Sequence, residues 1–360
     1  MLRYFVNTTR FNVDALATLA ATASFAQSSV TISGALDAGI ASTKNGDGTT
    51  VNAMASGIHG ASRLRFVGVE DLGGGMKAAF WLEGTLTNDE GTSAGLKFAR
   101  RSTLDLAGSF GAIRLGRDYT PTFWSHTVFD PFGTLGSGAG SNITLTGFNG
   151  NGTTAARTSN GVSYLYNVAA NGGSHALGSQ GLYAQVTHAF GEQPSTAAAQ
   201  TNQYQGARVG YASGPWNVAV STGNTVVSAS AKDKHSNIAG SYDLGVAQLM
   251  AINASFTNGT TNVKWTSNQI GAKIPMGAGY IPVSYAVAKN NTNSQEANQF
   301  AIGYVHNLSK RTALYTAYSS ISNKNGAGFT FLGGNGGYNA GLTAAGANGT
   351  GIDLGIRHSF

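Results

Sequence analysis

Short segments in which apolar and polar side chains alternate recur along the chain. Residues 352–360 place mostly large apolar side chains on one strand face and small or polar ones on the other, namely Ile352, Leu354, Ile356, His358 and Phe360 against Asp353, Gly355, Arg357 and Ser359. Residues 30–40 and 216–221 show the same period of two. Such alternation predicts β-strands with one apolar and one polar face. About sixteen segments of about ten residues each are counted, the size range of transmembrane barrels with an aqueous lumen.

The composition narrows the choice of fold. Only 11% of the residues are charged, whereas the hydrophobic fraction is an ordinary 41%, and cysteine is absent. Beyond the N-terminus no run of apolar residues is long enough for a transmembrane helix, which needs about 18 or more. A closed barrel is the other way to cross lipid, because an open sheet leaves backbone groups unpaired. The sequence therefore predicts an all-β, antiparallel transmembrane barrel, and the absence of cysteine excludes a disulfide framework.

The N-terminus has features of an export signal. Arg3 and Arg10 precede a stretch of small apolar residues, and Ser24-Phe25-Ala26 resembles a cleavage site for a signal peptidase, although Asn12 and Asp14 interrupt the stretch. We therefore expect a signal peptide over residues 1–26 and a barrel over residues 27–360.

The connections between strands are of unequal length. Short ones lie at 71–75, 108–111, 213–215, 244–245 and 307–310. Long ones, rich in Gly, Asn, Ser and Thr, are expected at 42–61, 119–160, 192–203, 224–235 and 322–350. Outer-membrane barrels have short periplasmic turns and long outer loops. The central connection is too long for a turn, so we expect residues 118–160 to fold inward and narrow the channel.

Several motifs, spread from the expected mature start to the last residue, resemble one family. They are residues 27–31 (QSSVT), 70–78 (EDLGGGMKA), 80–84 (FWLEG), 100–103 (RRST), 114–118 (RLGRD), 304–315 (YVHNLSKRTALY) and 355–360 (GIRHSF). Together they resemble the general trimeric porins of Gram-negative bacteria, and most closely the anion-selective porins of β-proteobacteria. The resemblance implies a homotrimer in the outer membrane, surrounded by lipid and lipopolysaccharide, and passive passage of small anionic solutes such as organic acids or phosphate.

The resemblance also implies which residues form the constriction. By their motifs, the basic residues correspond to Arg63, Arg100 and Arg157, and the acidic ones to Glu83 and Asp130. Strict alternation instead favours Arg101 over Arg100 as the residue facing the lumen, because Arg101 shares a strand face with Thr103 and Asp105. Both arginines therefore remain candidates, and a β-bulge or a position above the membrane plane would reconcile them.

The proposed chemistry is selection by charge. Arginine stays ionised and offers paired donors to carboxylates and phosphates, so crowded guanidiniums favour anions. Arg65, Lys77, Arg117 and Asp118 are candidates for secondary charges of the lumen wall. The final Phe360 resembles the terminal aromatic that the outer-membrane assembly machinery recognises.

Other functional classes find little support in the sequence. The seven histidines lack the spacing of metal ligands, and we identify no phosphate-binding loop or dinucleotide fingerprint, so we expect neither a metal nor a cofactor. The net charge of +6 is not gathered into a basic run, which argues against nucleic acid. An outer-membrane enzyme and a surface receptor or adhesin barrel of little conductance remain as alternatives to the channel.

Overall fold

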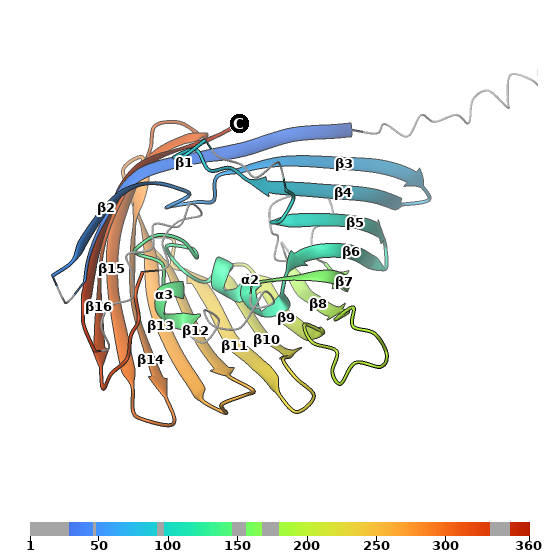
Figure 1. Ribbon diagram of the computed structural model, residues 1–360. Coiled ribbons are helices and arrows are strands. Elements are labelled where there is room, and N and C mark those ends of the chain that lie inside the picture. Colours follow the sequence, from blue (N-terminus) through green and yellow to red (C-terminus); the bar gives the residue numbers. More distant parts are fainter. Residues whose placement is uncertain (1–28, 46–47, 92–96, 146–155, 168–179, 332–345) are drawn as a thin grey trace, which may run out of the picture.

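A single antiparallel sheet that closes on itself forms the wall of the molecule in the part of the chain that the structure describes. The structure, a computed structural model, describes residues 29–45, 48–91, 97–145, 156–167, 180–331 and 346–360. The sheet has seventeen strands, and the ring closes where β1 pairs with β17 (Figure 1). β2 and β3 pair with successive stretches of β1, residues 38–44 and 29–35, and so share one position in the wall. The wall therefore has sixteen positions, which confirms the predicted barrel.

From β3 onward each strand pairs with the next one in sequence, whereas β1 pairs with β2, β3 and β17. The strands are β1 (Ser29–Asn45), β2 (Thr50–Ser56), β3 (Arg63–Gly73), β4 (Met76–Thr85), β5 (Arg101–Gly108), β6 (Gly111–Tyr119), β7 (Arg157–Tyr166), β8 (Gly181–Ala189), β9 (Tyr204–Ser213), β10 (Trp216–Val226), β11 (Lys232–Asp243), β12 (Gln248–Thr257), β13 (Lys264–Met276), β14 (Gly279–Asn290), β15 (Glu296–Asn307), β16 (Thr312–Lys324) and β17 (Gly349–Ser359).

The alternation seen in the sequence separates the two surfaces of the wall. In β17, Ile352 and Leu354 are more than half exposed on the outside, whereas Asp353 is buried on the lumen side. In β5, Leu104 and Leu106 point outward, and the polar residues that alternate with them, Thr103 and Asp105, are buried inside. The outer surface is apolar because it meets lipid, and the inner surface is polar because it lines water.

The connection between β6 and β7 enters the barrel, and we call it the inward loop. It carries α2 (Pro121–Val128) and α3 (Ser141–Thr144), both of which lie inside the ring in Figure 1. α2 begins where the Thr120 hydroxyl accepts a hydrogen bond from the Phe123 amide, with Pro121 in its first turn. It packs against β8 to β11, while α3 packs against β13 to β15.

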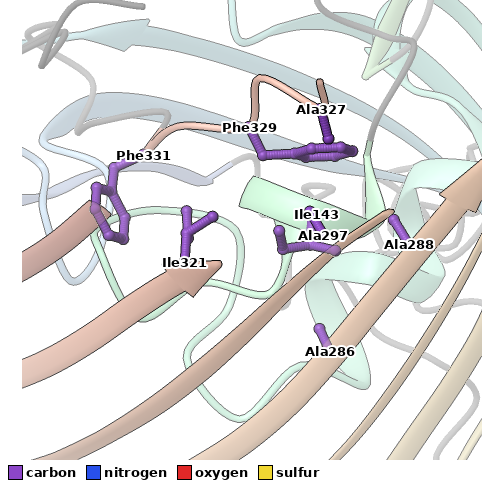
Figure 2. Packing of buried hydrophobic residues seen from close by; sticks show 8 residues of the cluster. All are labelled: Ile143, Ala286, Ala288, Ala297, Ile321, Ala327, Phe329 and Phe331. Atoms are coloured by element: carbon purple, nitrogen blue, oxygen red, sulfur yellow. The ribbon is translucent and has the colours of Figure 1, made fainter. Parts of the chain in front are cut away.

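Apolar contacts hold the far part of the inward loop against the wall. Ile143 of α3 packs among Ala286, Ala288 and Ala297 of β14 and β15, together with aromatic residues that follow β16, as Figure 2 shows. Small side chains on these strands leave room for the loop. Burying a residue the size of Ile143 stabilises this contact by about 1.5–3 kcal/mol.

Two of the long connections are shorter than predicted. β1 and β2 extend into residues 42–61, and β10 and β11 extend into residues 224–235. The outward side chains there are polar, as at Lys232 and Lys234. This polarity hid the strands, because strands that rise above the bilayer have no reason to be apolar outside.

One further connection departs from the expected sorting of loops. Residues 167–180 join β7 to β8 at the end of the barrel that carries the short turns.

No helix within the described ranges is long and apolar enough to cross a bilayer.

We predict that a charge on the outer surface destabilises the barrel. Ile238 lies in the middle of β11 and is 57% exposed on the lipid side. Ile238→Arg should cost about 2–4 kcal/mol, because the charge meets hydrocarbon. Ile238→Phe, which stays apolar, is the control and should fold almost as stably. Reversible denaturant unfolding in lipid vesicles measures both, and equal stability of the two variants would contradict the assigned outer face.

Candidate functional site

Three arginines gather around one carboxylate on the inner wall. Arg63 begins β3, Glu83 lies on the neighbouring β4, and Arg100 directly precedes β5. The buried Glu83 accepts a hydrogen bond from Arg100 Nε at 2.7 Å, and its second oxygen lies 3.9 Å from Arg63 Nε. The cross-strand register places them together, because Glu83 pairs with Arg65 on one side and with Arg101 on the other.

Arg157 joins this group from the end of the inward loop. It begins β7, and its Nε donates to the backbone carbonyl of Arg100 at 2.8 Å. A second guanidinium nitrogen donates to the Tyr119 hydroxyl at 2.8 Å, and the guanidinium lies 4.3 Å from the centre of that ring. Tyr119 is the last residue of β6, so Arg157 clamps the base of the inward loop to the wall.

Positive charge exceeds negative charge in this cluster, which consists of Arg63, Arg100, Arg157 and Glu83. Within the described ranges, Arg63 and Arg100 have Glu83 as their ion-pair partner, and Arg157 has no carboxylate within 4.0 Å. The three arginines keep N–H donors that no residue of the described ranges accepts. An anion that reaches them gains charge-assisted hydrogen bonds.

The structure places both arginines of the Arg100–Arg101 pair inside, in different roles. Arg101 begins β5 on the lumen face, as alternation predicts, and its guanidinium lies 4.4 Å from the centre of the Trp81 ring. Arg100 precedes the strand, although its amide still donates to the Glu83 carbonyl. Because Arg100 lies outside β5, its side chain need not follow the alternation of strand faces, and it donates to the Glu83 carboxylate.

Arg101 belongs to a second network, in which charges are balanced. Arg114 Nη2 lies 2.8 Å from Asp105 Oδ2, and Arg114 Nη1 lies 2.7 Å from Asp118 Oδ2. Arg101 lies 3.6 Å and 3.7 Å from the same two carboxylates. All four side chains are at least nine-tenths buried, so this network braces β5 against β6 rather than offering donors to solutes.

The other predicted lumen charges are dispersed. Arg65 donates to the Ser33 hydroxyl at 2.8 Å and also lies over Trp81, and Lys77 lies on the lumen side of β4 next to its short turn. Arg117 lies on the face of β6 that carries Leu115, opposite Arg114. There it donates to the Ala99 carbonyl and to Ser159, a placement that differs from the lumen position predicted for it.

Asp130 does not join the arginine cluster. Its two oxygens accept hydrogen bonds from the amides of Phe132 at 2.9 Å and Gly140 at 2.8 Å, so it ties together two parts of the inward loop. Burial raises the pKa of Asp130 to about 7. Its carboxyl group therefore shapes the loop, and in the described part of the chain it forms no ion pair with an arginine.

Sequence reasoning missed the contacts that hold the inward loop in place. Asp353 of β17 accepts hydrogen bonds from the Ser137 amide at 2.7 Å and the Ser137 hydroxyl at 2.8 Å. On the opposite wall, His126 of α2 meets His235 of β11 with 3.4 Å between their Nε2 atoms. Burial lowers the pKa of His126 to about 3, so this ring is neutral at neutral pH. Only the polar inner faces of the strands hinted at such anchors.

Comparison with known proteins identifies the family. The family model described as Gram-negative porin matches residues 15–326. The chain belongs to the Gram-negative porin family. Outer membrane porin protein 32 of Delftia acidovorans is 38% identical to this porin, with 96% of this chain and 98% of the relative covered. An outer membrane porin protein of Bordetella pertussis is 27% identical and covers 85% of this chain, and 84% of its own length is matched.

A solved structure gives the same result for the fold. The anion-selective porin from Comamonas acidovorans superposes with a TM-score of 0.81 at 33% identity, over 93% of this porin and all of that chain. This porin is therefore a β-barrel of the Gram-negative outer membrane that forms a water-filled channel for passive diffusion. Family and fold imply a channel rather than an enzyme.

Two predictions concern the ends of the chain. The expected signal peptide, residues 1–26, lies outside the described residues. Phe360 is exposed on the outside, and its amide donates to the Gly34 carbonyl at 3.1 Å. Its role as an assembly signal stays a prediction, which deletion of Phe360 and measurement of the porin reaching the outer membrane can test.

We predict that breaking the balanced network destabilises this porin. Arg114→Met leaves Asp105 and Asp118 with one distant guanidinium between them, and removal of one partner of a buried ion pair costs about 3–5 kcal/mol. Arg117→Met on the same strand is the control, because Arg117 has no ion-pair partner in the described ranges. Denaturant unfolding should separate the variants, and an equal loss of stability in both would contradict the bracing role.

Proposed function

We propose that this porin favours small anions, such as organic acids or phosphate, and selects them at the cluster of Arg63, Arg100, Arg157 and Glu83. The observation that carries the proposal is that three guanidiniums lie together with a single carboxylate, which pairs with two of them, beside the base of the inward loop. The excess positive charge attracts anions and repels cations. This effect is strong where the loop reduces the width of the water-filled path.

The geometry suits passage rather than tight binding. Glu83 and Tyr119 fix the orientation of the arginines, so their remaining donors point to solutes without rearrangement. An anion that enters gives up part of its water shell and receives hydrogen bonds in exchange. Selectivity with conduction requires that this exchange be nearly balanced, because a tightly held solute would block the pore.

The described selectivity of a relative supports the same proposal. The porin from Comamonas acidovorans, which is 33% identical and aligned over its full length, is anion-selective. The two chains share a fold along almost all of this porin, and the proposed cluster stands on the wall of that fold.

We also propose that three chains associate through the wall around the closure. The large apolar side chains exposed on the outside of β1, β2 and β17 are aliphatic or methionine, namely Val30, Ile32, Leu36, Ile40, Met54, Ile352, Leu354 and Ile356, whereas β7 to β16 carry outward tyrosine, tryptophan and phenylalanine. Aromatic residues favour contact with lipid headgroups, so a wall without them fits contact with protein. Native mass spectrometry of detergent-extracted porin is expected to return trimers, and single chains alone would contradict this assembly.

Charge reversal in the cluster tests the proposed selectivity. Arg63→Glu combined with Arg100→Glu should reverse the anion preference, because the cluster would then carry three carboxylates and one guanidinium. The zero-current potential across a planar bilayer in a salt gradient measures the preference. Lys310→Glu combined with Arg311→Glu, exposed in a short turn, is the control and should keep the sign of the original preference. An unchanged sign in the cluster variant would overturn the proposal.

A further inference from the structure

Two further cations lie on the inner wall, at some distance along the chain from the arginine cluster. Arg357 lies on the lumen face of β17 and Lys273 on the lumen face of β13. The inward loop contacts β17 at Asp353, four residues before Arg357, and it approaches β13 at Gly271, where Pro131 would meet an added Cβ at 2.7 Å. From these contacts both strands run on to the end with short turns, so Arg357 and Lys273 lie on the periplasmic side of the loop.

Neither cation forms an ion pair in the described part of the chain, although Asp37 attracts Arg357 and Asp130 attracts Lys273 from beyond 4.0 Å. Throughout the described ranges, no Asp or Glu oxygen lies within 4.0 Å of the Arg357 guanidinium or the Lys273 amine. Arg357 Nε is buried and has no hydrogen-bond partner among the described residues. Asp37 is opposite Arg357 in register, but its oxygens accept from the amides of Ile58 and Gly60 and from the Tyr315 hydroxyl.

Aromatic side chains connect the two cations. The Tyr280 hydroxyl lies 3.5 Å from His59 Nε2, and the His59 ring stacks on Tyr315 with centroids 5.0 Å apart. Lys273 Nζ lies 5.8 Å from the centre of the Tyr280 ring. The Arg357 guanidinium packs so closely on Gly60 that an added Cβ there would lie 3.1 Å from its carbon. Arg357 and Lys273 thus flank one surface, to which Tyr280 and His59 contribute.

Both cations act electrostatically on His59. Burial in the first place, followed by the charges of Arg357 and Lys273, lowers the pKa of His59 to about 4. The imidazole is therefore neutral at neutral pH, and the two positive charges of the surface are those of Arg357 and Lys273. Arg357 also repels Arg63, so this surface is electrostatically continuous with the arginine cluster.

We infer that Arg357 and Lys273, with the Tyr280 hydroxyl and His59 between them, form a second anion-binding position on the periplasmic side of the inward loop. The inference rests on the proposed anion preference and extends it. Two separate cations suit a small oxyanion with two charges, such as a dicarboxylate or phosphate. One charged group would contact the Arg357 guanidinium, which offers paired donors, and the other would contact the Lys273 amine.

Such a position would act in series with the arginine cluster. An anion that leaves the cluster toward the periplasm meets a second favourable position instead of bulk water, which lowers the barrier to exit. Two weak positions in series also let an entering anion displace the one ahead of it. The periplasmic position is then the first that an anion meets when it enters from the periplasm.

Side-specific block of current tests this inference. Chloride current through channels of known orientation is measured while succinate or inorganic phosphate is added to one side at a time. In Arg357→Gln combined with Lys273→Gln, the apparent dissociation constant for block from the periplasmic side should rise at least about fivefold, or about 1 kcal/mol, and block from the opposite side should change less. Arg357→Lys combined with Lys273→Arg keeps both charges and should retain most of the block.

The control removes one Lys and one Arg charge from the end of the barrel that carries the short turns. Lys310→Gln combined with Arg311→Gln should leave periplasmic block almost unchanged, because both side chains are exposed in the turn before β16. The inference would be overturned if the apparent dissociation constant for periplasmic block rose less than about fivefold in Arg357→Gln combined with Lys273→Gln, or rose equally in the control. If block is lost as described but the original channel prefers cations, the proposed selectivity fails independently. If the preference for anions holds while block is unchanged, only the second position fails.

Discussion

The structure depends on the backbone hydrogen bonds that close the sheet into a ring. Hydrocarbon offers no partner for an unpaired amide or carbonyl, so the ring has to close, and β1 closes it by pairing with β17 along eleven residues. Closure fixes which side chains point inward, because neighbouring residues of a strand face opposite ways. It also brings Arg357, near the end of the chain, beside β1 and the segment that contains Gly60.

The inner wall uses charge in two ways, and the difference lies in the balance of each group. Arg101 and Arg114 face Asp105 and Asp118, so these charges satisfy one another and brace two strands. Around Glu83 the guanidiniums outnumber the carboxylate, and the surplus is available to solutes. Arg357 and Lys273 extend this surplus along the wall, and within the described ranges neither has a carboxylate oxygen within 4.0 Å. The same side-chain chemistry thus gives stability in one place and attraction for anions in another.

Much of the fold could be predicted from the sequence, since each strand that crosses lipid repeats the alternation that is plain at Ile352 and Asp353. The strand extensions at 224–235 could not be predicted, because outside the bilayer the outward face need not be apolar. Motifs brought Arg63, Arg100 and Arg157 together as candidates, and the structure places them within one cluster. The resemblance also named Asp130 as an acidic residue of the constriction, but its described hydrogen bonds are to amides of the inward loop, and sequence spacing does not reveal which amides a loop carboxylate meets.

The central claim is that unneutralised guanidiniums make the water-filled path favourable for anions. The zero-current potential of the unmodified channel, measured across a gradient of potassium chloride at low and at high salt, tests it most directly. We predict a potential displaced toward the equilibrium potential of chloride, with a displacement that shrinks as salt screens the charges. A potential displaced toward the equilibrium potential of potassium at low salt would contradict the account.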